Sequence, residues 1–203
     1  MSICKQLLKE SCQDKCIGPC GCFKYGPSNI DGTMKAFTAK RKHRNFKDSE
    51  FRKLAGDILI EFYSFFEKKC ILWPMFGTLL GMIRENDIIP HDEDIDFGFF
   101  KKDEDKIVEI LDNLHGKKGF EVIRNQFKTI YTVHKKGVFI DLYLFERTNT
   151  EQLNQGHRHF YNLLEDEVFP LKTIKFRNTE LNCIAKPKIW LERYYGKNWT
   201  IPE

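Results

Sequence analysis

The chain has 203 residues, of which 41% are hydrophobic and 14% aromatic, so it is long enough for one domain with a substantial core. Its formal net charge of +4 suits a protein that handles anionic phosphates but does not by itself demand nucleic acid. No apolar stretch approaches the ~20 residues of a membrane span, and the N-terminus lacks the apolar run of a secretory signal, so we expect a cytoplasmic protein without a membrane span.

Five cysteines crowd residues 1–34, which we interpret as a leader ahead of the domain expected over residues 35–203. Three interpretations stay open: a small zinc site, a disulfide-bonded tag, or a leader whose cysteines have no specific role. The spacings lack the C-x2-C pairs typical of zinc sites and no histidine lies among them, which disfavours zinc. The five are Cys4, Cys12, Cys16, Cys20 and Cys22. Cys70 and Cys183 stand in apolar surroundings and are expected to be buried thiols.

Basic residues are frequent from Lys35 to Lys53, which indicates either a patch for phosphate or nucleic acid or a solvated linker. Aromatic side chains are sparse there, so the linker is favoured. Asp48 or Ser49 is then expected to cap a helix, and apolar residues at helical spacing predict a buried stripe along it. These residues are Phe51, Leu54, Ala55, Ile58, Leu59, Phe62, Phe65 and Phe66.

The remaining elements follow from residue periodicity and from glycine and proline positions. Residues 71–76 read as a buried strand in which Pro74 favours an edge or a bend, and a short helix follows over 77–84. The later elements are strands over 94–99, 120–123, 129–134, 138–145 and 171–176, a helix over 103–114, a polar loop over 147–156, a turn over 165–170 and a helix over 187–195. Together they predict an α+β domain built on a small mixed or antiparallel sheet.

Acids occupy every second residue where the strand over 94–99 begins. Asp92, Asp94 and Asp96 are expected to share one face of this strand, because strand side chains alternate between faces. Like charges this close repel each other, and a divalent cation is the usual reason for such an arrangement. The alternative is an exposed acidic strand without a function.

Asp141 is a lone acid in the apolar strand over 138–145. If the two acidic strands are neighbours, Asp94, Asp96 and Asp141 converge on a site that suits Mg²⁺ or Mn²⁺. The alternative is a structural ion pair between Asp141 and Arg84.

Several separated blocks resemble the LicD family, which includes bacterial phosphocholine transferases and, in animals, fukutin and fukutin-related protein. The longest block runs from Phe76 to Asp96, and the next is Val138–Tyr143. The other blocks are Val168–Leu171, Lys186–Pro187, Tyr194–Gly196 and Trp199. The resemblance covers roughly residues 50–202. His91 and Glu93 depart from the family pattern, and the cysteine-rich leader has no counterpart in it.

The resemblance implies a nucleotidyltransferase-like fold, a small mixed β-sheet flanked by helices. Such enzymes transfer a substituted phosphate, of the phosphocholine or ribitol phosphate type, from a CDP-activated donor to a sugar or glycan hydroxyl, and CMP leaves. By the same resemblance Asp94 and Asp96 would hold the metal ion against the donor's pyrophosphate. Asp141 would complete the metal site and orient or deprotonate the acceptor hydroxyl.

Four further residues receive roles. Gly77 and Thr78 would let backbone N–H groups at a helix start cradle a phosphate. Arg84 would neutralise negative charge nearby, and Asp92 would support the metal ligands from outside.

Three other functions stay open. The chain could transfer a nucleoside monophosphate from a nucleoside triphosphate, or it could be a zinc- or nucleic-acid-binding module, although nucleic acid is not the expected partner. A scaffold without catalysis is the third, and the intact Asp94, Asp96 and Asp141 argue against it. If choline is the carried group, an aromatic cage is expected, and Phe139 and Tyr143 share the face of Asp141.

Overall fold

The computed structural model describes residues 44–124, 130–147, 152–154 and 163–202 of the 203. The cysteine-rich leader and the first part of the basic stretch, up to residue 43, lie outside the described residues, so the zinc hypothesis and the division at residue 34 stay predictions. Among the helices of the described segments, none combines the length and apolar character needed to cross a bilayer.

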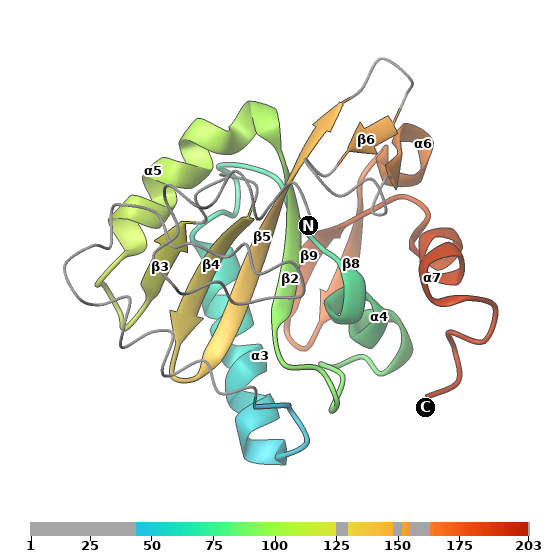
Figure 1. The fold of residues 1–203 in the computed structure, drawn as a ribbon, viewed down its shortest axis with the longest axis horizontal. Coiled ribbons are helices and arrows are strands. Elements are labelled where there is room, and N and C mark those ends of the chain that lie inside the picture. Colours follow the sequence, from blue (N-terminus) through green and yellow to red (C-terminus); the bar gives the residue numbers. More distant parts are fainter. Residues whose placement is uncertain (1–43, 125–129, 148–151, 155–162, 203) are drawn as a thin grey trace, which may run out of the picture.

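A mixed sheet forms the centre of the molecule (Figure 1). Its main strands lie in the order β1-β2-β5-β4-β3, and β2 runs parallel to β5 while the other neighbours are antiparallel. The bounds are β1 Leu72–Pro74, β2 Ile95–Phe100, β3 Glu121–Arg124, β4 Ile130–Lys135 and β5 Val138–Arg147. The predicted α+β class with a small mixed sheet is therefore confirmed.

Short strands extend this core. β6 (Gln152–Asn154) pairs with the end of β5 and with β7 (Leu163–Leu164). A separate hairpin consists of β8 (Lys172–Phe176) and β9 (Thr179–Cys183). Pro74 lies on the edge strand β1, as predicted, where its missing N–H leaves no gap in the ladder.

One face of the sheet is covered by two amphipathic helices. α3 (Ser49–Ser64) is capped by Asp48, whose side chain accepts a hydrogen bond of 2.7 Å from the backbone N–H of Phe51. After the 3₁₀ turn η2 (Lys101–Asp103), α5 spans Glu104–Leu114. Their apolar stripes join alternate strand residues in one cluster, which includes Phe62, Ile107 and Leu142. The predicted helices are confirmed, and most residues of their apolar stripes are buried, whereas Leu54, Phe65 and Ile110 are only partly buried.

The other face carries the shorter helices α4 (Phe76–Arg84), α6 (Glu165–Val168) and α7 (Pro187–Tyr195). A second cluster around Trp73, Phe145 and Trp190 packs them against the sheet. α7 ends at Gly196, whose φ of 86° is readily adopted only by glycine. The two clusters divide along β5 as alternation requires, with Leu142 in one and Phe145 in the other.

Some local predictions were wrong. Phe76 begins α4 with a φ of 44° instead of ending a strand. The expected loop over 147–156 contains the end of β5 and all of β6. Of the two lone cysteines, Cys183 is buried as expected, but Cys70 is only partly buried.

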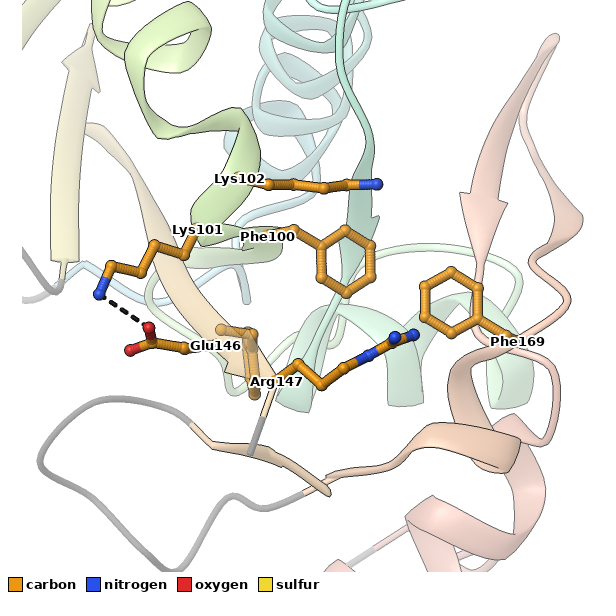
Figure 2. A pocket seen from close by; sticks show the side chains of 7 residues that line it. Phe100, Lys101, Lys102, Glu146, Arg147 and Phe169 are labelled. Carbon is orange, nitrogen blue, oxygen red and sulfur yellow. Dashed lines mark hydrogen bonds and ion pairs between the residues drawn. The ribbon is translucent and has the colours of Figure 1, made fainter. Parts of the chain in front are cut away.

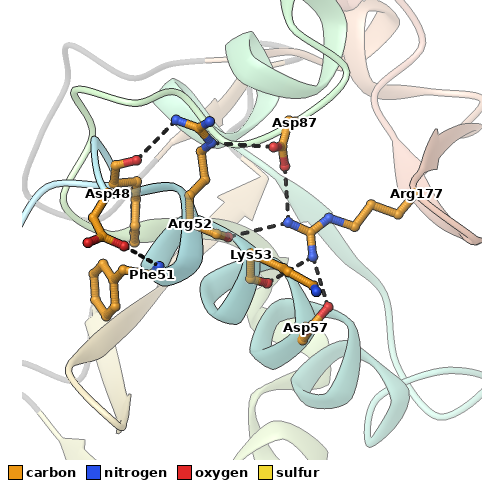
Figure 3. Close-up of polar contacts among 8 residues, drawn as sticks. Asp48, Phe51, Arg52, Lys53, Asp57, Asp87 and Arg177 are labelled. Atoms are coloured by element: carbon orange, nitrogen blue, oxygen red, sulfur yellow. Dashed lines mark hydrogen bonds and ion pairs between the residues drawn. The ribbon is translucent and has the colours of Figure 1, made fainter.

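Arg177, at the turn between β8 and β9, fastens this hairpin to the rest of the domain (Figure 3). Its guanidinium donates to Asp57 at 2.9 Å, to Asp87 at 3.2 Å and to two main-chain carbonyls of α3. The group lies directly over Gly56, where any Cβ would collide with it. Asp87 belongs to the loop that leads from α4 toward the acidic strand, so one side chain joins the hairpin, α3 and this loop.

Candidate active site

Three carboxylates meet where β2 and β5 run side by side. Asp96 and Asp141 are direct neighbours in the parallel register, and Asp94 lies one residue before β2 begins. One oxygen from each of the three lies within 4.8 Å of the other two. The structure thus brings together the three acids that the sequence singled out, because the strands that carry them are adjacent.

Neighbouring hydroxyl groups hold these acids in place. Thr132 on β4 stands opposite Asp141 and donates a hydrogen bond of 2.6 Å to it. Tyr143, two residues after Asp141 on the same face of β5, hydrogen-bonds to Asp96. The backbone N–H of Asp96 donates to the hydroxyl of Thr78 at 2.8 Å, which ties the start of α4 to β2. All these side chains lie on the side of the sheet that carries α4 and α7.

The electrostatic environment of the site disfavours further negative charge. The pKa of Asp96 is raised well above its usual range, first by burial and then by the charges of Asp94, Asp141 and Asp92. The hydrogen bond with Tyr143 opposes this rise. Buried carboxylates that repel each other are stabilised by a bound cation, so the arrangement suits an ion with a preference for oxygen ligands.

Asp92 lies beside the cluster but not on the strand. β2 begins only at Ile95, so Asp92 and Asp94 both precede the strand, and the expectation that Asp92, Asp94 and Asp96 share one strand face is wrong. Asp94 nevertheless joins Asp96 in the cluster. Its carboxylate packs against Gly77, where a Cβ would collide with Oδ2. Within the described part of the chain this buried Oδ2 has no hydrogen-bond partner. Burial is the main cause that raises the pKa of Asp92 to about 6.

The N-terminus of α4 lies beside this region, because Gly77 packs against Asp92 and the hydroxyl of Thr78 accepts a hydrogen bond from the backbone of Asp96. Met75 stands at the cap position and provides no side-chain hydrogen bond. The first turn contains both Gly77 and Thr78, the residues proposed to cradle phosphate. At the other end of α4, Arg84 donates to Glu85 at 2.7 Å and to the carbonyl of Trp199 at 3.1 Å. Arg84 is therefore held by the segment after α7.

Aromatic side chains line the same side of the site. Phe76 meets Tyr143 edge to face at 5.1 Å between ring centroids and Tyr194 at 5.4 Å. Tyr195 is 40% exposed, and its pKa is raised by burial first and then by Tyr194, Asp92 and Asp96. Phe139, the other aromatic residue on the face of Asp141, packs instead on His134.

Sequence reasoning missed Thr132 and Tyr195 as neighbours of the acids. A polar residue in the apolar strand around Thr132 was a weak signal for the first. Tyr195 became a neighbour only through the packing of α7 against α4, which no local pattern predicts.

A separate cavity of about 440 Å³ lies at the far ends of the same two strands (Figure 2). Phe100, Phe145 and Phe169 provide its apolar surface, and Lys102 and Arg147 reach toward it. Phe100 is four residues beyond Asp96, which corresponds to about 13 Å along a strand. None of the predicted site residues lines this cavity.

Comparisons with known proteins agree with the geometry. A family model described as LicD/FKTN/FKRP, nucleotidyltransferase domain, matches residues 69–183, which is more than half of the chain. An uncharacterised protein of Rickettsia prowazekii (strain Madrid E) is 30% identical over 131 residues, covering 61% of this chain and 46% of that protein. The Homo sapiens ribitol-5-phosphate transferase FKTN is 27% identical over 159 residues, covering 75% of this chain and 34% of that protein. The chain thus spans less than half the length of these curated relatives.

Among solved structures, the crystal structure of ANT(2")-Ia in complex with adenylyl-2"-tobramycin aligns with a TM-score of 0.49 and 13% identity. The alignment covers 70% of this chain and 76% of that one.

Proposed function

Since the chain belongs to the LicD/FKTN/FKRP nucleotidyltransferase-domain family, we propose that it is a metal-dependent transferase of substituted phosphate groups. The transferred group is of the phosphocholine or ribitol phosphate type, the donor is CDP-activated, and the acceptor is a sugar or glycan hydroxyl. The observation that carries this proposal is the convergence of Asp94, Asp96 and Asp141 inside the matched segment.

The donor set fits a hard divalent cation such as Mg²⁺ or Mn²⁺. Asp94, Asp96 and Asp141 offer carboxylate oxygens close enough to share one ion, and the raised pKa of Asp96 reflects charge that such an ion would balance. The unpaired Oδ2 of Asp92 is a further acceptor for an ordered water near them. When bound, the cation would supply charge neutralisation at the donor's pyrophosphate.

The start of α4 would bind phosphate. The first turn carries the positive end of the helix dipole, Met75 provides no side-chain cap, and Gly77 lacks a side chain that would block the approach of a phosphate. The hydroxyl of Thr78 already accepts a hydrogen bond from Asp96, so its own proton remains available to a phosphate oxygen. Arg84, at the other end of α4, would neutralise negative charge nearby.

The chemical step is one substitution at phosphorus. The acceptor oxygen forms a bond to the phosphorus of the transferred group, the bond to the bridging pyrophosphate oxygen breaks, and CMP takes that oxygen. The hydroxyl proton passes to a carboxylate, for which Asp141 is the candidate because Thr132 fixes its orientation. Positioning and charge neutralisation would supply most of the rate.

Thermal unfolding with CDP-choline, CDP-ribitol, CTP and ATP, each with and without Mg²⁺, tests this proposal. We expect one CDP donor to raise Tm only with Mg²⁺, and Asp94→Ala to abolish the rise. The matched control is Asp105→Ala, an exposed acid on α5 that should respond as the wild type does. A ligand at 100 times its Kd contributes about 2.7 kcal/mol. A rise with CTP or ATP alone would favour nucleotidyl transfer, and no response to any nucleotide would refute the proposal.

A further inference from the structure

A second concave surface lies on the side of the sheet that α3 and α5 cover, between α5 and the C-terminal end of α3. Its volume is about 570 Å³, and its floor is apolar. Phe65, Ile110 and Leu114 form this floor and also pack against the core cluster beneath it. We call this surface the α3–α5 groove.

Lysines surround the groove without acidic partners. Lys69, Lys106, Lys117 and Lys118 all line it, whereas Glu109 is the one acid among its lining residues. None of the four lysines forms an ion pair with any residue in the described segments. Lys118 extends over the ring of Phe65 at 5.0 Å from its centroid. With four lysines and one glutamate, the residues that line the groove carry a net charge of +3.

The cavity of Figure 2 differs in this respect. Two of its cations are already neutralised, because Lys101 pairs with Glu146 at 2.9 Å and Arg147 pairs with Glu165. Of the cations at that cavity, only Lys102 lacks an ion pair within the described residues, whereas the α3–α5 groove has four such lysines above its apolar floor. The groove therefore favours an occupant that brings both negative charge and apolar side chains.

We propose that the α3–α5 groove docks an acidic amphipathic helix of another protein. The lining positions on α5, from Lys106 to Leu114, repeat at the spacing of one helix face and extend about 12 Å. That length accommodates two turns of a partner helix. Apolar side chains of the partner would rest on Phe65 and Ile110, and its carboxylates would meet the four lysines. Because the floor of the groove is recessed, a partner helix whose side chains project into it fits better than a partner with a flat surface.

The character of the rim sets the kind of complex. Lysine ammonium groups are strongly hydrated and mobile, so they speed association and tolerate different acidic partners. We expect weak, salt-sensitive binding. The acids of the candidate active site belong to the opposite face of the sheet, with Tyr143, so docking would leave them accessible. The inference is independent of the proposed function.

The probe is a synthetic helix of about five turns with leucines at helical spacing and glutamates elsewhere, labelled for fluorescence anisotropy and measured on the full chain. A scrambled peptide of equal composition has the same charge without the apolar face. Ile110→Glu removes part of the floor, and Lys117→Glu, on an exposed turn, reverses a rim charge without threatening the fold. Lys172→Glu, an exposed lysine on β8, is the matched control.

We expect Ile110→Glu and Lys117→Glu to weaken binding about tenfold and about fivefold, and the scrambled peptide to bind about tenfold more weakly. Lys172→Glu should change the Kd by less than about twofold. Equal binding of both peptides, or equal loss with Lys172→Glu, would overturn the proposal. The proposal would also be overturned if the chain bound phosphatidylserine vesicles but not the peptide, and Lys117→Glu abolished the vesicle binding. A dimer of the chain in sedimentation that Ile110→Glu dissociates would overturn it as well.

Discussion

Replacement of Gly56 by alanine should change the stability of the domain in opposite directions, depending on whether Arg177 is present. Alanine in a helix interior is about 1 kcal/mol more favourable than glycine, so the substitution alone favours α3. In the wild type, however, the new Cβ would occupy the place of the Arg177 guanidinium and displace it. The hydrogen bonds of Arg177 would be lost with that movement.

The size of the effect follows from those hydrogen bonds. Asp57 is 62% exposed and contributes little, whereas Asp87 and the two carbonyls of α3 contribute about 1 kcal/mol each. Displacement of Arg177 therefore costs about 3 kcal/mol, and the net effect of Gly56→Ala is a loss of about 2 kcal/mol. In an Arg177→Ala background nothing is displaced, and Gly56→Ala should stabilise by about 1 kcal/mol.

Urea unfolding of the wild type, Gly56→Ala, Arg177→Ala and the double variant measures the effect of Gly56→Ala on the free energy of unfolding with and without Arg177. Equal m-values would show that the variants unfold from comparable states. For a domain of this size each kcal/mol shifts Tm by about 2–4 °C, so both signs are measurable. If Gly56→Ala stabilised the protein in both backgrounds, the hydrogen bonds of Arg177 to α3 and Asp87 would not contribute to stability as inferred.

Three further predictions concern buried charge. Because its pKa is raised to about 6, Asp92 keeps its proton in the folded protein between about pH 4 and 6, whereas the unfolded chain has lost it. The free energy of unfolding therefore falls as pH rises through this window, and it does not change further above it. Asp92→Asn should remove this fall and stabilise the metal-free protein at pH 7 by up to about 3 kcal/mol; identical pH dependence of urea unfolding in both proteins would contradict this. Asp96→Asn and Asp141→Asn should raise Tm without divalent cations and abolish the further rise with Mg²⁺, and a variant that still responds to Mg²⁺ would exclude its residue as a ligand. Arg193→Ala leaves the buried Glu167 without its two hydrogen bonds of 2.7 Å and should cost about 2–3 kcal/mol, an effect that Glu167→Gln in the same chain should reduce.

Local patterns in the sequence were sufficient for most of the fold. The apolar stripe of α3, the alternation along β5 and the Pro187 and Gly196 signals of α7 each reflect short-range sterics and burial, which a single segment reveals. β9 escaped prediction because its five residues, Thr179–Cys183, contain no β-branched run and only weak alternation. Its pairing with β8 comes from the turn at Arg177 and from packing.

The candidate site was predictable only in part for the same reason. Asp96 and Asp141 stand out because an acid in an apolar strand demands a partner, and their meeting required only that the two strands be neighbours. The position of Asp92 could not follow from strand alternation, since it lies in a loop whose path depends on Gly77 and on the anchoring of Asp87 by Arg177. Contacts of that kind arise only from the assembled tertiary structure.

The parallel pairing of β2 with β5 also implies an order of assembly. Asp96 and Asp141 are 45 residues apart in the sequence, whereas β3, β4 and β5 form a meander of near neighbours. Closing the short turns of the meander costs less chain entropy than bringing β2 alongside β5, so the hairpins should form first and the parallel pair should close late. During synthesis, the cluster of Asp94, Asp96 and Asp141 therefore does not exist until β5 has emerged from the ribosome, and the repulsion among these acids is felt only in the last steps of folding.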